Sequence, residues 1–136
     1  MTYVVGPVRF DVPATSANLG PGFDALGLAL ELRDELTASV TESGLSVEVH
    51  GEGSGALAVD DSHLVVRAMR MTFAALGVPM PGLHLVCHNA VPQARGLGSS
   101  SAAIVGGVHL ARALVAGGPE QLPDLEAIRL AARLEG

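Results

Sequence analysis

The sequence of 136 residues has the length of one ordinary domain, and 49% of it is hydrophobic, which excludes a disordered chain. Acidic residues outnumber basic ones by 14 to 8, and a net charge of −6 argues against a nucleic-acid binder. All basic residues are arginines, which excludes a lysine-dependent P-loop and a Schiff-base lysine. The single cysteine, Cys87, excludes an internal disulfide and fits a reducing compartment.

Neither a targeting signal nor a membrane span is predicted. The N-terminus has no basic start followed by an apolar core, and the longest apolar stretch, 102–116, contains His109 and Arg112. That stretch is also too short to cross a bilayer. We therefore expect a cytoplasmic protein that binds neither membrane nor nucleic acid.

Strands dominate the first third of the chain. Alternating apolar and polar residues predict strands over 8–12, 36–41 and 45–50, and an apolar run predicts another over 25–32. Residues 13–24 are rich in proline, glycine, serine and asparagine, which predicts a loop with special backbone angles.

A helix is predicted from His63, capped by Ser62 and ended by Gly77. Its helical spacing assigns three residues to the core rather than to a cofactor: Met69, Met71 and Phe73. The acidic pair Asp60-Asp61 lies just before this helix, where the helix dipole favours negative charge, so we do not interpret it as a metal site.

Alternation predicts a further strand over 83–88, followed by a segment rich in glycine and serine. That segment opens an apolar helix that runs to about Ala116 and ends at Gly117-Gly118-Pro119. Gly106 and Gly107 lie inside the helix, where glycine lowers helix stability, so we expect them to permit close packing. A last helix is predicted over 125–134, and the order of elements indicates an α+β fold.

The glycine- and serine-rich segment 91–102 has the features of a phosphate site that needs no lysine. Backbone N–H groups at a helix start converge there, and the helix dipole adds positive potential. Serine hydroxyls can ligate Mg²⁺, and Arg95 can add a charged contact. The alternative is a serine-rich helix cap on a flexible loop.

The same residues resemble a known family. Val91-Pro92-x-Ala94-x-Gly96-Leu97-Gly98-Ser99-Ser100-Ser101-Ala102 resembles the phosphate-loop signature of the GHMP kinases. The run Pro13-Ala14-Thr15-Ser16-Ala17-Asn18-Leu19-Gly20-Pro21-Gly22-Phe23-Asp24 is similar to the first motif of the homoserine kinases within that superfamily. Weaker similarity extends over the whole chain, including 62–65 and 131–136.

This resemblance implies a phosphotransferase that uses ATP and Mg²⁺ to convert L-homoserine into O-phospho-L-homoserine, on the route to threonine. Asn18 and Asp24 would contact homoserine, with Asp24 facing its ammonium group. Ser100 and Glu135 would hold Mg²⁺, with Glu126 as the fallback for Glu135. The implied catalytic residues are thus Asp24, Ser100 and Glu135. The implied nucleotide contacts are His63, Pro92, Gln93, Ala94, Arg95, Gly96, Leu97, Gly98, Ser99, Ser100, Ser101 and Ala102.

The resemblance also implies the fold: a two-layer GHMP-kinase N-terminal domain, with a mixed sheet packed on helices. This fold is ribosomal-protein-like and has a left-handed βαβ crossover, contrary to the common right-handed rule. We expect residues 1–136 to be the ATP-binding front part of a longer protein whose C-terminal domain is absent. The resemblance leaves open whether the protein forms a homodimer.

Several alternatives remain. The protein could be another GHMP small-molecule kinase, acting on mevalonate or a sugar, or a catalytically silent binding module. Asn18 and Asp24 could serve only as turn formers, and Glu135 could be a solvated charge at a helix end. His84 and His88 share a strand face, but no third ligand stands out, so we do not interpret them as a metal site.

Overall fold

The computed structural model describes residues 2–13, 33–51, 54–55, 59–90 and 99–135, and for residues 13, 99–101 and 135 it describes the backbone only. The elements are β1 (Val8–Pro13), β2 (Arg33–Thr41), β3 (Leu45–Gly51), α2 (Leu64–Ala75), β4 (Gly82–Asn89), α3 (Ser99–Leu114), α4 (Gly118–Gln121) and α5 (Asp124–Glu135). The four strands, α2, α3 and α5 confirm the sequence predictions. The strand expected over 25–32 lies outside the described residues.

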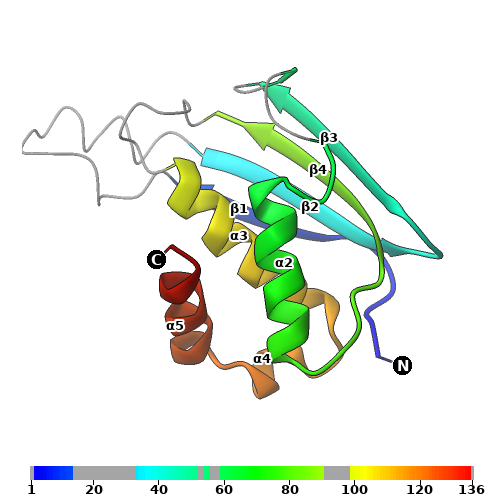
Figure 1. The fold of residues 1–136 in the computed structure, drawn as a ribbon, viewed down its shortest axis with the longest axis vertical. Coiled ribbons are helices and arrows are strands. Elements are labelled where there is room, and N and C mark those ends of the chain that lie inside the picture. The colour runs from blue at the N-terminus through cyan, green and yellow to red at the C-terminus, as the bar shows by residue number, and fades with distance from the viewer. Residues whose placement is uncertain (1, 14–32, 52–53, 56–58, 91–98, 136) are drawn as a thin grey trace, which may run out of the picture.

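The strands form one mixed sheet in the order β1-β2-β4-β3. The β1–β2 and β2–β4 pairs are antiparallel, whereas β3 and β4 are parallel. The helices cover one face of this sheet (Figure 1), which confirms the two-layer α+β architecture. With the helices toward the viewer and the strands turned to point up, β4 lies to the left of β3, so the β3–α2–β4 connection is left-handed.

The core lies between the sheet and α2 and α3. On the two central strands, β2 and β4, the inward face carries five fully or almost fully buried residues: Leu36, Ala38, Leu83, Leu85 and Cys87. From α2 the core receives Met69 and Phe73, as predicted, but Met71 is 49% exposed and its assignment to the core was wrong. Two residues along a helix turn the side chain by about 200°, so Met71 points away from the face of Met69.

Two adjacent glycines let α3 pack closely on both of its neighbours, as predicted. A Cβ at Gly106 would collide with the Leu36 side chain of the sheet. A Cβ at Gly107 would lie 2.6 Å from the Ala68 Cβ and 2.6 Å from the Val65 carbonyl oxygen on α2. The helix is therefore wedged between sheet and α2, which explains why its apolar residues occupy most faces.

The predicted C-terminal end of α2 is confirmed, whereas its N-terminal cap differs from the prediction. Gly77 follows the helix with a φ of +73°, a left-handed conformation that favours glycine, as expected of a helix stop. The cap, however, is His63 rather than Ser62. The Ser62 hydroxyl instead donates to Asp60 Oδ1 at 2.6 Å, and this bond lowers the pKa of Asp60.

The last part of the chain folds back onto α3. The predicted stop after α3 contains a short helix, α4, that the sequence did not suggest. Arg112, mostly buried on α3, donates to the Leu122 carbonyl oxygen and to Asp124 Oδ1 at 2.8 Å. These bonds fix the start of α5 against α3.

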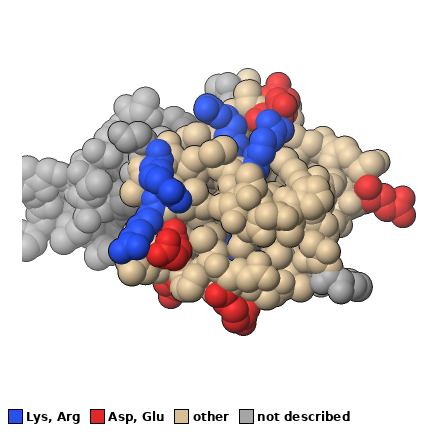
Figure 2. Space-filling view, turned by 60° about the horizontal axis from the view of Figure 1, so that its bottom comes forward, with Lys and Arg blue, Asp and Glu red and all other residues tan. Residues whose placement is uncertain are grey.

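Charges of both signs are mixed on the surface. Figure 2 brings the lower end of the helices forward. Arginine and acidic side chains lie beside one another there in small groups, and wide uncharged areas separate these groups. Across the described ranges, no helix combines the length and the apolar character needed to cross a bilayer.

Candidate functional site

The predicted site residues divide into three groups. Asn18, Asp24 and the loop residues Pro92 to Gly98 lie outside the described part of the chain. Ser99, Ser100, Ser101 and Glu135 have a described backbone in α3 and α5, but nothing is described of their side chains. His63 and Ala102 are described in full, and both are buried.

The strand ends that carry the two motif segments meet at one end of the sheet. β1 ends at Pro13, which pairs with Arg33 at the start of β2. β4 is the antiparallel neighbour of β2 and ends at Asn89. The last pair between these two strands, Glu35 and His88, lies next to that end. The segment with Asn18 and Asp24 connects β1 to β2, and the glycine-serine segment follows β4, the other neighbour of β2, so both join the sheet at the same end (Figure 1).

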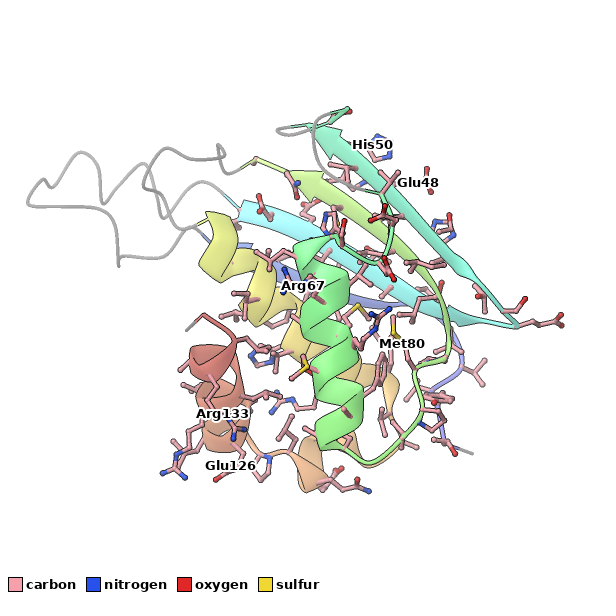
Figure 3. All side chains as sticks on the ribbon, viewed as in Figure 1. Glu48, His50, Arg67, Met80, Glu126 and Arg133 are labelled. Carbon is pink, nitrogen blue, oxygen red and sulfur yellow. The ribbon has the colours of Figure 1, made fainter. Side chains whose placement is uncertain are left out.

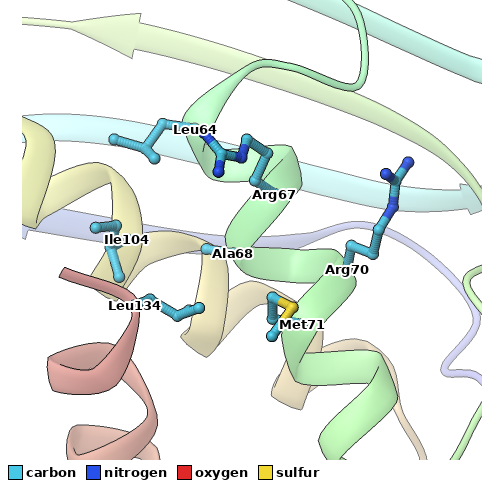
Figure 4. A pocket seen from close by; sticks show the side chains of 7 residues that line it. All are labelled: Leu64, Arg67, Ala68, Arg70, Met71, Ile104 and Leu134. Atoms are coloured by element: carbon cyan, nitrogen blue, oxygen red, sulfur yellow. The ribbon is translucent and has the colours of Figure 1, made fainter. Parts of the chain in front are cut away.

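Three helix ends converge on this side of the molecule as well. α2 and α3 both begin near this end of the sheet, and α5 runs toward it (Figure 1). Leu64 at the start of α2, Ile104 near the start of α3 and Leu134 at the end of α5 line a common pocket of about 280 Å³, shown in Figure 4. The backbones of Ser100 and Glu135 consequently belong to helix ends that approach one another.

The start of α3 suits a bound anion. Ser99 opens a helix of 16 residues, and its first turn contains no acidic residue. Unpaired N–H groups and the macrodipole give such an end a partial positive charge. The glycine-serine segment leads directly into it, so backbone groups there can bind phosphate without a lysine.

One ring nitrogen of His63 accepts a hydrogen bond, and the other has no partner in the part of the chain that the structure describes. Its Nδ1 accepts a hydrogen bond from the Val65 N–H at 3.2 Å and so caps α2. Nδ1 therefore carries no proton, which leaves Nε2 as the donor of a neutral ring. Burial lowers the pKa of His63, and Nε2 has no hydrogen-bond partner among the described residues although the residue is only 6% exposed. A buried donor of this kind fits a ligand that brings an acceptor.

Glu126, the fallback for Glu135, lies at the wrong end of its helix. It belongs to the first turn of α5 and pairs with Arg129 at 3.1 Å. Figure 3 shows Glu126 at the lower end of the helical layer, away from the starts of α2 and α3. The structure therefore gives no support to Glu126 as a metal ligand.

The histidines of β3 and β4 gather on the face of the sheet opposite the helices, where Figure 3 labels Glu48 and His50. His84 Nε2 lies 2.8 Å from Glu48 Oε2, and the His50 and His88 rings stack with their centroids 4.8 Å apart. Within the described ranges, no group of three or more His, Cys, Asp or Glu side chains is arranged to hold a metal ion.

One polar residue near the predicted site was missed by the sequence analysis. Asp34 is only 5% exposed, and its Oδ1 accepts a hydrogen bond from the Ala90 N–H at 2.9 Å. The predicted strand began at Leu36 and so excluded it. The available signal was the spacing, since Asp34 precedes Leu36 and Ala38 by steps of two and therefore shares their inward face.

Comparison with known proteins identifies similar chains. The sequence pattern of the family described as GHMP kinases N terminal domain matches residues 63–136. The chain is 54% identical to the homoserine kinase of Streptomyces coelicolor over 95% of this chain and 42% of that protein. It is 56% identical to the homoserine kinase of Corynebacterium diphtheriae over 95% of this chain and 41% of that protein. The chain thus spans about two fifths of the length of these relatives.

Solved structures agree with this fold. A Listeria monocytogenes protein, provisionally described as a homoserine kinase, is 34% identical with a TM-score of 0.65, over 96% of this chain and 44% of that one. The homoserine kinase of Cytophaga hutchinsonii has a TM-score of 0.67 over 95% of this chain and 41% of that one. At 22% identity, the second similarity supports the fold alone.

Proposed function

Because this chain belongs to the GHMP kinase family, we propose that the protein transfers a phosphoryl group from ATP to the side-chain hydroxyl of L-homoserine. The product would be O-phospho-L-homoserine, on the route to threonine. The observation that carries the proposal is the identity of 54% and 56% to proteins named homoserine kinase, over 95% of this chain. The first motif and the glycine-serine signature, whose segments join the sheet at the same end, agree with it.

The described residues fit a nucleotide. The start of α3 has a dipole that favours phosphate and no acidic residue in its first turn to oppose it. His63 supplies a buried donor at the start of α2 without a partner among the described residues. We therefore assign to ATP the loop residues Pro92 to Gly98, the helix start Ser99 to Ala102, and His63.

Ser100 and Glu135 are the proposed Mg²⁺ ligands. A hydroxyl and a carboxylate are oxygen donors, which Mg²⁺ prefers. The pocket shared by Ile104 and Leu134 supports the pairing, because each lies close in sequence to one of the two residues. When bound, ATP supplies the phosphoryl group and Mg²⁺ neutralises its negative charge. Since the chain has no lysine, its own contribution comes from backbone N–H groups, hydroxyls and arginines.

Asn18 and Asp24 are the proposed residues for the amino acid. Their segment is joined to β1 and β2 beside the exit of β4, so it starts and ends near the proposed nucleotide site. The Asp24 carboxylate would bind the substrate ammonium group and so orient the side-chain hydroxyl toward the phosphate. Positioning of this kind accounts for much of the catalysis in phosphoryl transfer.

The location and the partners of the protein are also part of the proposal. The buried free thiol of Cys87 fits a reducing compartment, and we propose the cytoplasm as the location. The proposed partner is the small-molecule substrate, L-homoserine. A homodimer is the oligomeric state to test. We propose no nucleic-acid or membrane partner.

The test is ADP release by the full-length protein with Mg·ATP. We expect release to rise on addition of L-homoserine and to stay at the acceptor-free level with mevalonate. Mevalonate represents the alternative, another small-molecule kinase of the GHMP superfamily. Stimulation by mevalonate instead of homoserine would overturn the substrate assignment.

A further inference from the structure

Asp34 is a buried carboxylate at the end of the sheet where the proposed site lies. It shares the inward face of β2 with Leu36 and Ala38, and it is 5% exposed. A carboxylate at such a position is costly unless hydrogen bonds compensate for the loss of water. Its place on the inward face of β2, among core residues, therefore calls for a specific partner.

One partner is a backbone group 56 residues away along the chain. Asp34 Oδ1 accepts the hydrogen bond of the Ala90 N–H at 2.9 Å. The paired residues of β2 and β4 end with Glu35 and His88, so the Ala90 N–H lies beyond the last pair of the ladder. The carboxylate thus adds one charge-assisted hydrogen bond between the two strands beyond the end of their backbone ladder. Asp34 is also close enough to Cys87 to add to the rise that burial causes in the pKa of that thiol.

The hydrogen bond between Asp34 and Ala90 lies where both motif segments join the sheet. Ala90 is followed directly by residue 91, the first residue of the glycine-serine signature. Arg33, the neighbour of Asp34, directly follows the segment 14–32 that contains Asn18 and Asp24. One hydrogen bond thus holds together the exit of one segment and the return of the other.

The start of α3 lies at the same level. Gly106 packs on Leu36 and Val12. Four residues back along a helix and two residues back along a strand both cover about 6 Å. Because α3 runs along the sheet in the direction of β2, from Gly106 over Leu36 to Leu114 beside Val4, Asp34 lies at about the level of Ala102.

We propose that Asp34 is a positioning residue for the nucleotide site: through the Ala90 N–H it holds the end of β4, from which the glycine-serine signature continues, beside the start of β2 and at the level of the start of α3. This inference rests on the proposed function, because it assumes that the loop binds ATP. Asp34 acts through the backbone of Ala90 and touches no reacting atom.

Three variants of the full-length protein test the proposal. Asp34→Ala removes the acceptor, Asp34→Asn keeps an oxygen in the same place, and Val40→Ala weakens the other end of the same strand. The readouts are the melting temperature, the Kd for Mg·ADP by calorimetry, and separate KM values for Mg·ATP and L-homoserine. Hydrogen exchange at the Ala90 amide reports directly on the bond.

For Asp34→Ala we expect the Kd for Mg·ADP and the KM for Mg·ATP to rise at least about tenfold, because small displacements of a binding loop are costly. Exchange at Ala90 should accelerate. Asp34→Asn should restore the affinity for Mg·ADP to within about threefold, since its amide oxygen accepts the same N–H. Val40→Ala should lower the melting temperature and leave the Kd for Mg·ADP unchanged.

The proposal is overturned if Asp34→Ala binds Mg·ADP as tightly as Val40→Ala does at a similar loss of thermal stability. It is overturned as well if Asp34→Asn binds no better than Asp34→Ala. Failure of the proposed function gives a different result. A wild type that binds Mg·ADP but does not respond to L-homoserine loses the substrate assignment, while the comparison of Asp34 variants still stands.

Discussion

Gly107 on α3 lies so close to Val65 on α2 that an added Cβ would stand 2.6 Å from the Val65 carbonyl oxygen. We predict that Gly107→Ala lowers the free energy of unfolding by about 1–3 kcal/mol through overpacking. This loss should occur although alanine has the better helix propensity by about 1 kcal/mol. Chemical denaturation of the full-length protein measures it.

Gly106→Ala is the matched control for this prediction. The obstacle there is the end of the Leu36 side chain, which can rotate away, whereas a backbone carbonyl cannot. We expect the Gly106 variant to lose less stability than the Gly107 variant. Equal losses of stability in the two variants would contradict the prediction that the Val65 carbonyl makes the contact at Gly107 the more costly to overpack.

His63 should couple the stability of α2 to pH. Burial lowers the pKa of His63 from its usual 6.5, so below that pH the unfolded chain takes up a proton that the folded chain refuses. Stability contributed at neutral pH is therefore lost as the pH falls. His63→Asn keeps a capping side chain and cannot be protonated, so its stability should fall less than that of the wild type between about pH 8 and about pH 5.

His63→Ala separates the cap from the titration. Loss of the bond from the Val65 N–H should cost about 1 kcal/mol at neutral pH. The asparagine variant should lose much less. Urea denaturation at each pH gives these values, and identical pH dependence of the wild type and His63→Asn would contradict the assignment.

Cys87 should destabilise the protein at alkaline pH. Burial, with the Asp34 carboxylate as a second cause, raises the pKa of this thiol from 9.0 to about 12. Above pH 9.0 the unfolded chain releases the thiol proton while the folded chain keeps it, so stability falls by about 1.4 kcal/mol for each pH unit up to about 12. Cys87→Ala should lack this slope when denaturation is compared at about pH 8 and about pH 10. Parallel curves for the two proteins would refute the prediction.

Glu135 and Glu126 offer a matched pair on one helix. If Glu135 holds Mg²⁺, Glu135→Gln should lower kcat of the full-length protein by about a hundredfold, as the loss of one stabilising group in a transition state does. Glu126→Gln should leave kcat unchanged, because Glu126 pairs with Arg129 in the first turn of α5. Steady-state kinetics at saturating Mg·ATP decide this. Similar effects of both substitutions would exclude a specific role for Glu135.

Much of the fold follows from local patterns in the sequence. The alternation of Leu45, Val47 and Val49 predicted β3, and these residues do pack toward the core. Gly77 predicted the end of α2 because only a residue tolerant of positive φ continues the chain there. The apolar character of α3 on most faces predicted its position between two layers.

The errors arise where two local signals compete or where the partner is distant. Ser62 and His63 are both able to cap α2, and the choice depends on Asp60 taking the Ser62 hydroxyl. The helix α4 follows Gly117, whose φ of +76° ends α3 and allows a new turn at once. Spacing could have placed Asp34 on the inward face of β2, but not beside the site, because Ala90, whose N–H it accepts, is 56 residues away. That the strand ends next to the two motif segments lie at one end of the sheet is likewise a product of strand order, which no local pattern encodes.

The most direct measurement of the central claim is identification of the phosphorylated product. The full-length protein would be incubated with Mg·ATP labelled at the terminal phosphate and with L-homoserine, and the products separated and examined by mass spectrometry. The account predicts labelled O-phospho-L-homoserine in amounts equal to the ADP formed. Label that appears only as inorganic phosphate, or on another acceptor but never on homoserine, would contradict it.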